Sequence, residues 1–279
     1  MTFKEVVMKK FLLFGLAAVL ALITAPVQAQ DSGDRIVVNF SDPSRPGLLR
    51  VNIINGSISV RSHSGGEVII ETRGSNRNRR PPVTPDGLRR IDNGAMGLSV
   101  EEENNVMSIG TRNSNDFGSL VIQVPAKTNL NLKTINGGGI EVDNVEGEIE
   151  VNNTNGSVQL NNVAGSIVAH ATNGRITATL REIAANKSMS FTSMNSNIDV
   201  TFPATTKANL KLRSDNGGTW SDFEIQLRSS PITTLDDQRA GGGRYRIQTD
   251  RTINGTINGG GPDVDMRTLN GNIYIRKGK

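Results

Sequence analysis

The stretch Gly138–Leu180, GGIEVDNVEGEIEVNNTNGSVQLNNVAGSIVAHATNGRITATL, decides the fold because it repeats every nine residues. Each unit starts with a glycine, and an aliphatic residue follows two positions later. The glycines are Gly138, Gly147, Gly156, Gly165 and Gly174, and the aliphatic residues are Ile140, Ile149, Val158, Ile167 and Ile176. A second aliphatic residue two positions further on gives the alternation of a strand with one buried face. The segment is therefore a series of short β-strands separated by glycine turns, where positive φ is expected.

A longer period of eighteen residues lies over the first. Thr154-Asn155-Gly156 and Thr172-Asn173-Gly174 are equivalent turns in every second unit. A coil of two strands and two corners takes about eighteen residues, so equivalent corners stack and their Asn amides hydrogen-bond from coil to coil. The sequence predicts a β-solenoid, or parallel β-helix, in which Ile140 pairs in parallel with Val158. An antiparallel β-meander or sandwich is the alternative, since Asn-Gly is also a hairpin signal.

The same turns recur outside this stretch and predict one domain over residues 30–279. Residues 126–277 form its repeat region, and residues 35–125 supply N-terminal strands that cap the stack, with an Arg-rich loop at 73–97. The predicted structural turns are Asn136, Gly137, Asn155, Gly156, Asn173, Gly174, Asn216, Gly217, Asn254, Gly255, Asn270 and Gly271.

Residues 1–29 have the features of a signal peptide. Lys9 and Lys10 precede an apolar run from Phe11 to Thr24, and Val27-Gln28-Ala29 fits a cleavage site after Ala29. A start at Met8 instead of Met1 gives a more ordinary signal peptide. We therefore expect a periplasmic or extracellular protein with no stable transmembrane anchor after cleavage.

The repeat resembles a known family. The Thr-x-Asn-Gly-x-Ile-x-Val units, the Val124-Pro125-Ala126 lead-in and the C-terminal run from Gly255 through Ile275 are similar to the bacterial putative-adhesin family, a domain of unknown function. The resemblance covers roughly residues 35–277. It implies an exported β-rich repeat protein, and it carries over no catalytic residues.

Composition excludes several classes of protein. The chain has no cysteine and only two histidines, so thiolate metal sites, disulfides and a multi-histidine centre are out of reach. Aromatic residues are 4% of the chain, which disfavours a large aromatic cofactor pocket. We expect no cofactor, no metal and, at a net charge of +4 before cleavage, no nucleic-acid partner.

An arginine cluster is the strongest candidate for binding an anion. It comprises Arg73, Arg77, Arg79, Arg80, Arg89 and Arg90. Guanidinium groups bind carboxylate or phosphate through paired hydrogen bonds. A solvated polar insertion is the simpler interpretation, given Pro81-Pro82 and Pro85.

Other candidates have plainer structural explanations. Asp143, Glu146, Glu148 and Glu150 could supply acid–base chemistry, as in polysaccharide-acting β-helices, but their alternation with Ile149 is typical of the solvent side of a strand. Trp220 could stack on a sugar, although a role in the core or at the edge of the stack is the expected one.

The sequence thus predicts an exported, non-enzymatic envelope or surface protein with an adhesive or structural role. Its partner would be an envelope component, a glycan or a surface protein, and its oligomeric state is open. The alternatives are a polysaccharide-acting enzyme on a β-helix scaffold and an envelope scaffold that polymerises end to end.

Overall fold

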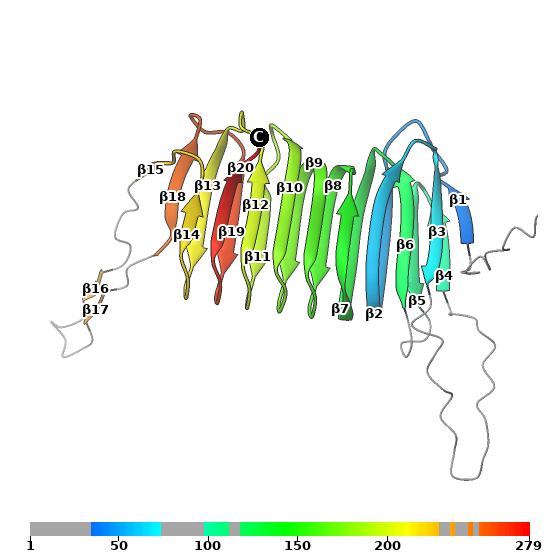
Figure 1. Ribbon diagram of the computed structural model, residues 1–279, viewed down its shortest axis with the longest axis horizontal. Coiled ribbons are helices and arrows are strands. Elements are labelled where there is room, and N and C mark those ends of the chain that lie inside the picture. Colours follow the sequence, from blue (N-terminus) through cyan, green and yellow to red (C-terminus); the bar gives the residue numbers. More distant parts are fainter. Residues whose placement is uncertain (1–34, 74–97, 112–117, 229–234, 238–244, 248–250) are drawn as a thin grey trace, which may run out of the picture. The chain divides into compact units, whose positions relative to one another are not determined.

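The computed structural model describes residues 35–73, 98–111, 118–228, 235–237, 245–247 and 251–279, and over these it is all-β (Figure 1). Hydrogen bonds join 18 strands into one large sheet that is not closed. A separate hairpin pairs β16 (Leu235–Asp237) with β17 (Tyr245–Ile247). The signal peptide predicted over 1–29 lies outside the described residues.

The strand pairings arrange the large sheet in two rows, which we call row A and row B. Row A contains, in spatial order, β4 (Leu98–Glu103), β5 (Val106–Thr111), the first part of β2 (Gly47–His63), the first part of β7 (Thr128–Asp143), β8 (Glu146–Asn153), the second part of β9 (Val158–Ala171), β11 (Met189–Ser193), β19 (Asp263–Thr268), β13 (Ala208–Ser214), β18 (Ile253–Ile257) and β15 (Gln226–Arg228). Row B contains β1 (Arg35–Asn39), β3 (Glu67–Arg73), β6 (Ser119–Pro125), the second parts of β2 and β7, the first part of β9, β10 (Ile176–Ile183), β12 (Ile198–Phe202), β20 (Ile273–Lys277) and β14 (Thr219–Ser221). The long strands β2, β7 and β9 pass through both rows.

The predicted register is confirmed in the repeat region. Ile140 pairs with Val158 and Val158 with Ile176, in parallel, and Ile149 pairs with Ile167 in the other row. Units eighteen residues apart are therefore neighbours, and an antiparallel meander is wrong for this segment. Antiparallel pairs occur toward the ends, as between β4 and β5 or β13 and β18.

One apolar core lies between the two rows. The aliphatic residues of the nine-residue units are buried, and residues of both rows belong to the same cluster. Phe191 and Phe202 are the largest fully buried side chains in the C-terminal part. The alternating pattern of the sequence thus leaves one side of each row to solvent.

Stacked asparagines join the corners of successive coils. Each side-chain amide donates a hydrogen bond to the side-chain oxygen of the asparagine in one neighbouring coil. The donor–acceptor pairs are Asn155–Asn136, Asn173–Asn155, Asn195–Asn173, Asn270–Asn195 and Asn216–Asn270, at 2.7–2.9 Å. The expected Asn ladder is present, and it includes Asn195, which the turn pattern had not indicated.

The glycine in these corners has a different function from the expected one. Gly156, Gly174, Gly217 and Gly271 are not among the residues with positive φ, unlike Gly137. A Cβ on Gly174 would instead overlap the carbonyl oxygen of Gly156 in the neighbouring coil, and the same holds for Gly156 against Gly138. Glycine is required here because two backbones approach closely.

Asn254-Gly255 was predicted as a corner, and this is wrong. Both residues lie within β18, where Asn254 pairs with Lys211 and Gly255 with Leu210. Gly255 leaves room for the side chain of Ile225. The turn falls four residues later, at Asn258 to Gly260, which all have positive φ.

Both ends of the stack depart from chain order. β2 lies between β5–β6 and β7, although β5 and β6 directly precede β7 in the sequence. Likewise β19 and β20 lie between β11–β12 and β13–β14. Figure 1 shows the red C-terminal strands between yellow and yellow-green ones. The expected cap of the N-terminal strands is therefore only partly correct: β1 is at an edge, but β2 is inside the stack.

Candidate binding face

The outward side chains of row A fall on lines across the strands, because paired residues lie in register. The central line, which we call the outer line, runs through Glu101, Ser108, Arg50, Asn131, Glu150, Val168, Ser190, Asp265, Lys211, Asn254 and Arg228. All of these residues except Val168 are polar or charged. Segments from the whole described chain thus contribute to one polar face.

Two hollows open on the outer line. The first has a volume of about 420 Å³ and lies over β2, β4, β5 and β7, where Ser99, Ser108 and Gly110 are small and Arg50 and Lys133 are long. Short side chains beside long ones on adjacent strands leave a depression in an otherwise even sheet surface.

The second hollow, about 580 Å³, lies over β9, β11, β19, β13, β18 and β15. Ser190 and Gly255 are its small residues, Lys211 and Arg228 its cationic ones, and Val168, which is 48% exposed, gives it an apolar contact. It combines residues on either side of the inserted C-terminal strand β19.

The carboxylates of the second hollow already have partners. Arg267 donates from Nε and Nη2 to the two oxygens of Asp265, at 2.8 and 2.7 Å. Asn209 donates through Nδ2 to Asp263 at 3.0 Å. The hollow therefore presents fixed polar groups of both charges, an arrangement that suits hydrogen bonding to a polar ligand more than capture of one ion.

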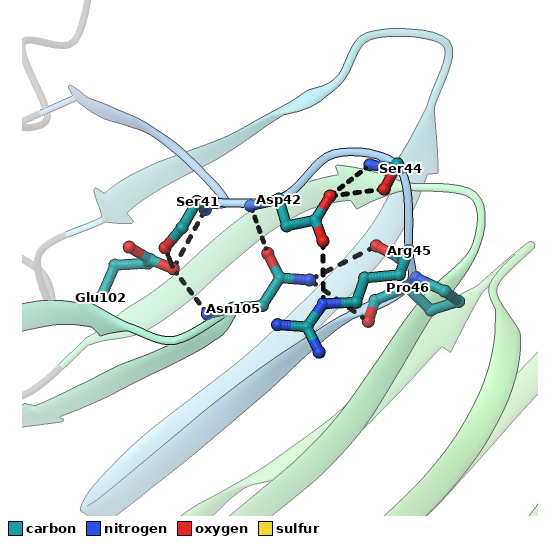
Figure 2. Close-up of polar contacts among 7 residues, drawn as sticks. All are labelled: Ser41, Asp42, Ser44, Arg45, Pro46, Glu102 and Asn105. Atoms are coloured by element: carbon teal, nitrogen blue, oxygen red, sulfur yellow. Dashed lines mark hydrogen bonds and ion pairs between the residues drawn. The ribbon is translucent and has the colours of Figure 1, made fainter.

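A polar cluster, which we call the clasp, joins the segment before β2 to the end of β4 and the turn that follows it (Figure 2). Glu102 on β4 accepts hydrogen bonds from the backbone amide and the hydroxyl of Ser41 and from the backbone amide of Asn105. The buried Asn105 accepts from the Asp42 amide and donates to the carbonyls of Arg45 and Pro46. The segment before β2 is thereby held against the β4–β5 turn, where Asn104 and Asn105 have positive φ.

Two carboxylates of the clasp are stabilised in the charged form. The hydrogen bonds from Ser41 lower the pKa of Glu102 below its ordinary value. The side-chain and backbone hydrogen bonds from Ser44 likewise lower the pKa of Asp42, which also pairs with Arg45 at 3.1 Å. We therefore expect the clasp to weaken when these carboxylates are protonated.

The carboxylates considered for acid–base chemistry do not form one site. Asp143 lies in row B and accepts from Asn161, whereas Glu150 lies in row A and accepts from Asn131. Glu148 pairs with Lys187, and Glu146 pairs with Arg181 at 3.4 Å. These side chains are on the solvent side of their strands, as the alternation indicated.

Of the arginine cluster, only Arg73 falls within the described residues, where it is exposed at the end of β3. Arg77, Arg79, Arg80, Arg89 and Arg90 lie outside them, so the anion-binding loop stays a prediction. Sequence reasoning missed both hollows and the clasp. The hollows depend on which strands become neighbours, and no periodic signal marks the insertion of β2 and β19.

Within the described ranges, no cluster of three or more His, Asp or Glu side chains is placed to hold a metal ion. In the same ranges, no helix is long and apolar enough to cross a membrane.

Comparison with solved structures gives matches that include two proteins from bacteria. One is a solved structure of a putative cell adhesion protein from Clostridium sporogenes, with a TM-score of 0.44 and 10% identity over 88% of this chain and 100% of that one. The other is a putative adhesin from Bacteroides fragilis, with a TM-score of 0.25 and 11% identity over 88% of this chain and 98% of that one. No family model and no curated protein matches the sequence. Likeness at this level does not bear on function, and the family resemblance of the repeat stays a prediction.

Proposed function

We propose that the chain is a two-row β-solenoid that acts as an exported, non-enzymatic binding protein of the cell envelope or surface, with an adhesive or structural role. The observation that supports this most strongly is the presence of two hollows on the same outer line of row A, each lined in part by charged side chains. Stacked repeats commonly bind through extended surfaces built from equivalent positions.

The face suits several weak contacts rather than one deep pocket. The first hollow presents Arg50, Lys133 and Glu101, and the second presents Lys211 and Arg228 beside partnered carboxylates. A long polar ligand, such as a glycan chain or an extended peptide, could contact both hollows at once. Contacts made together raise the overall affinity above that of either alone.

Blocking the second hollow tests this proposal. Ser190→Tyr adds a large side chain at a half-exposed strand position that favours aromatic residues. The matched control, Ser59→Tyr, makes the same change at a half-exposed position of β2 in row B. We expect Ser190→Tyr, but not Ser59→Tyr, to reduce retention of the purified protein on the envelope fraction.

Equal retention of the wild type, Ser190→Tyr and a corresponding Ser108→Tyr variant would contradict a role for row A. Far-UV circular dichroism and the unfolding midpoint show whether each variant keeps the fold, so a loss of retention can be assigned to the face.

A polysaccharide-acting enzyme is the competing function, and one observation favours it. Asp263 and Asp265 are two positions apart on β19 and both line the second hollow. The test is release of reducing ends from neutral and acidic glycans. Turnover that Asp263→Asn abolishes would replace the binding proposal with an enzymatic one.

A further inference from the structure

Trp220 lies on β14 at the end of row B and is the only tryptophan of the chain. Its ring stacks on Tyr274 of β20, with centroids 5.2 Å apart and planes 18° from parallel. The residue is nevertheless 51% exposed, although Tyr274 covers one face of its ring.

Contacts with Gly218 and Tyr274 hold the indole in place. The benzo edge of the ring lies over Gly218, where any Cβ would overlap it. Tyr274 is in turn fixed by Asn272, which donates to its hydroxyl at 3.1 Å, and by the Arg276 guanidinium, 5.5 Å from the ring centroid. A flat aromatic surface that is already ordered loses little conformational entropy when it binds a ligand.

Polar groups adjoin this aromatic pair. Asp199 is the register neighbour of Tyr274, and Arg276 donates to both of its carboxylate oxygens at 2.7 and 3.0 Å. Beyond Asp199 the same line continues with Thr177 and Gln159. Along this line the aromatic pair is therefore followed by charged and polar side chains.

This combination identifies the ligand class. The core of a protein interface needs a contiguous apolar patch, which this line of row B does not offer. A pyranose ring has an apolar C–H face that packs on an aromatic ring, and hydroxyl groups around it that bond to carboxylate and guanidinium. We propose that the Trp220–Tyr274 pair is a carbohydrate-binding platform, with Asp199 and Arg276 contacting sugar hydroxyls. This site goes beyond the function proposed for row A and does not depend on it.

The single tryptophan gives a direct readout. The purified protein is titrated with cellohexaose, chitohexaose and mannohexaose while its tryptophan emission is followed. We expect a saturable blue shift with at least one of these oligosaccharides. By calorimetry, Trp220→Ala should weaken binding of that oligosaccharide about tenfold or more, and Trp220→Phe should weaken it less.

Met194→Ala is the matched control, because Met194 is a similarly exposed apolar residue, 48% exposed, at a corner of the stack. It should bind as the wild type does. If Trp220→Ala does not fold, Trp220→Phe and Asp199→Ala replace it, and both should weaken binding.

The proposal is overturned if none of the three oligosaccharides shifts the emission, or if Trp220→Ala binds them as tightly as the wild type. It is also overturned if the emission shifts with protein concentration alone while the mass doubles, because the ring would then mediate self-association.

Discussion

At the residue scale, the Asn-Gly corner has two separable functions. Asparagines such as Asn173 bond to the coil on either side, donating to Asn155 and accepting from Asn195. Glycines such as Gly174 allow the backbones of adjacent coils to approach. The pattern in the sequence located corners such as Asn173-Gly174 but misplaced the one at Asn254-Gly255, and positive φ was the wrong reason for glycine at position 174.

Gly174→Ala should therefore destabilise the protein even though its φ is not positive. The added methyl group would overlap the carbonyl oxygen of Gly156, and backbone atoms cannot move aside easily. We expect a loss of about 1–3 kcal/mol in the free energy of unfolding, measured in urea. Gly66→Ala is the control, since no atom lies within 4 Å of its added Cβ. Equal stability of the two variants would refute the close-approach explanation.

The clasp should weaken in acid. The pKa of Glu102 is depressed in the folded protein, so its stabilising contribution is full above its ordinary value of 4.5 and is lost as pH falls through the lower folded value. Glu102→Gln should speed hydrogen exchange of the Asn105 amide at pH 7, where the carboxylate accepts from that amide.

This difference between Glu102→Gln and the wild type should shrink as the pH falls well below 4.5. Glu103→Gln, on the same strand, is the control and should exchange like the wild type. If the two exchange rates differ by the same factor down to low pH, the charge of Glu102 does not contribute to protection of the Asn105 backbone amide.

At the element scale, local strands were predictable and their order at the ends was not. The Ile140, Val158 and Ile176 register follows from an eighteen-residue period, because equivalent corners must stack. β2 and β19–β20 carry the same alternation as any other unit, so nothing in the sequence shows that they insert between coils that are consecutive in the chain. The hollow over β19 was unpredictable for the same reason.

Removal of the inserted strands should uncouple their neighbours. A chain ending at Gly259 lacks β19 and β20, the parallel partners of β13 and β14. We expect β13 and β14 to lose hydrogen-exchange protection while β8 to β10 keep theirs. The control is full-length Met266→Ala, which leaves a cavity in the buried side of β19 and should weaken the same strands only partly. Unchanged protection of β13 and β14 in the shortened chain would mean that they dock directly on β11 and β12.

At the scale of the whole molecule, each strand of the large sheet pairs with its immediate neighbours in its row, as the coils of the proposed solenoid would. Stability in such arrays is close to a sum of unit and interface terms, and long arrays lose all-or-none unfolding. The inserted strands oppose this, because each pairs with coils that are distant from it in the chain. The two ends unfold together only if unfolding of one end also destabilises the central coils, β7 to β10, and through them the other end.

A core substitution near the N-terminal end can measure how far a local loss of stability reaches along the stack. Ile122 on β6 is fully buried, and Ile122→Ala should cost about 2–5 kcal/mol locally. Trp220 reports on β14 and β20 by fluorescence, whereas far-UV circular dichroism reports on all strands. We expect the circular dichroism midpoint in urea to fall while the fluorescence midpoint moves less, because the damaged coils are separated from Trp220 by the central ones. Val200→Ala, on β12 beside β20, is the reciprocal case and should lower the fluorescence midpoint. Coincident shifts of both probes in both variants would instead make the stack one cooperative unit.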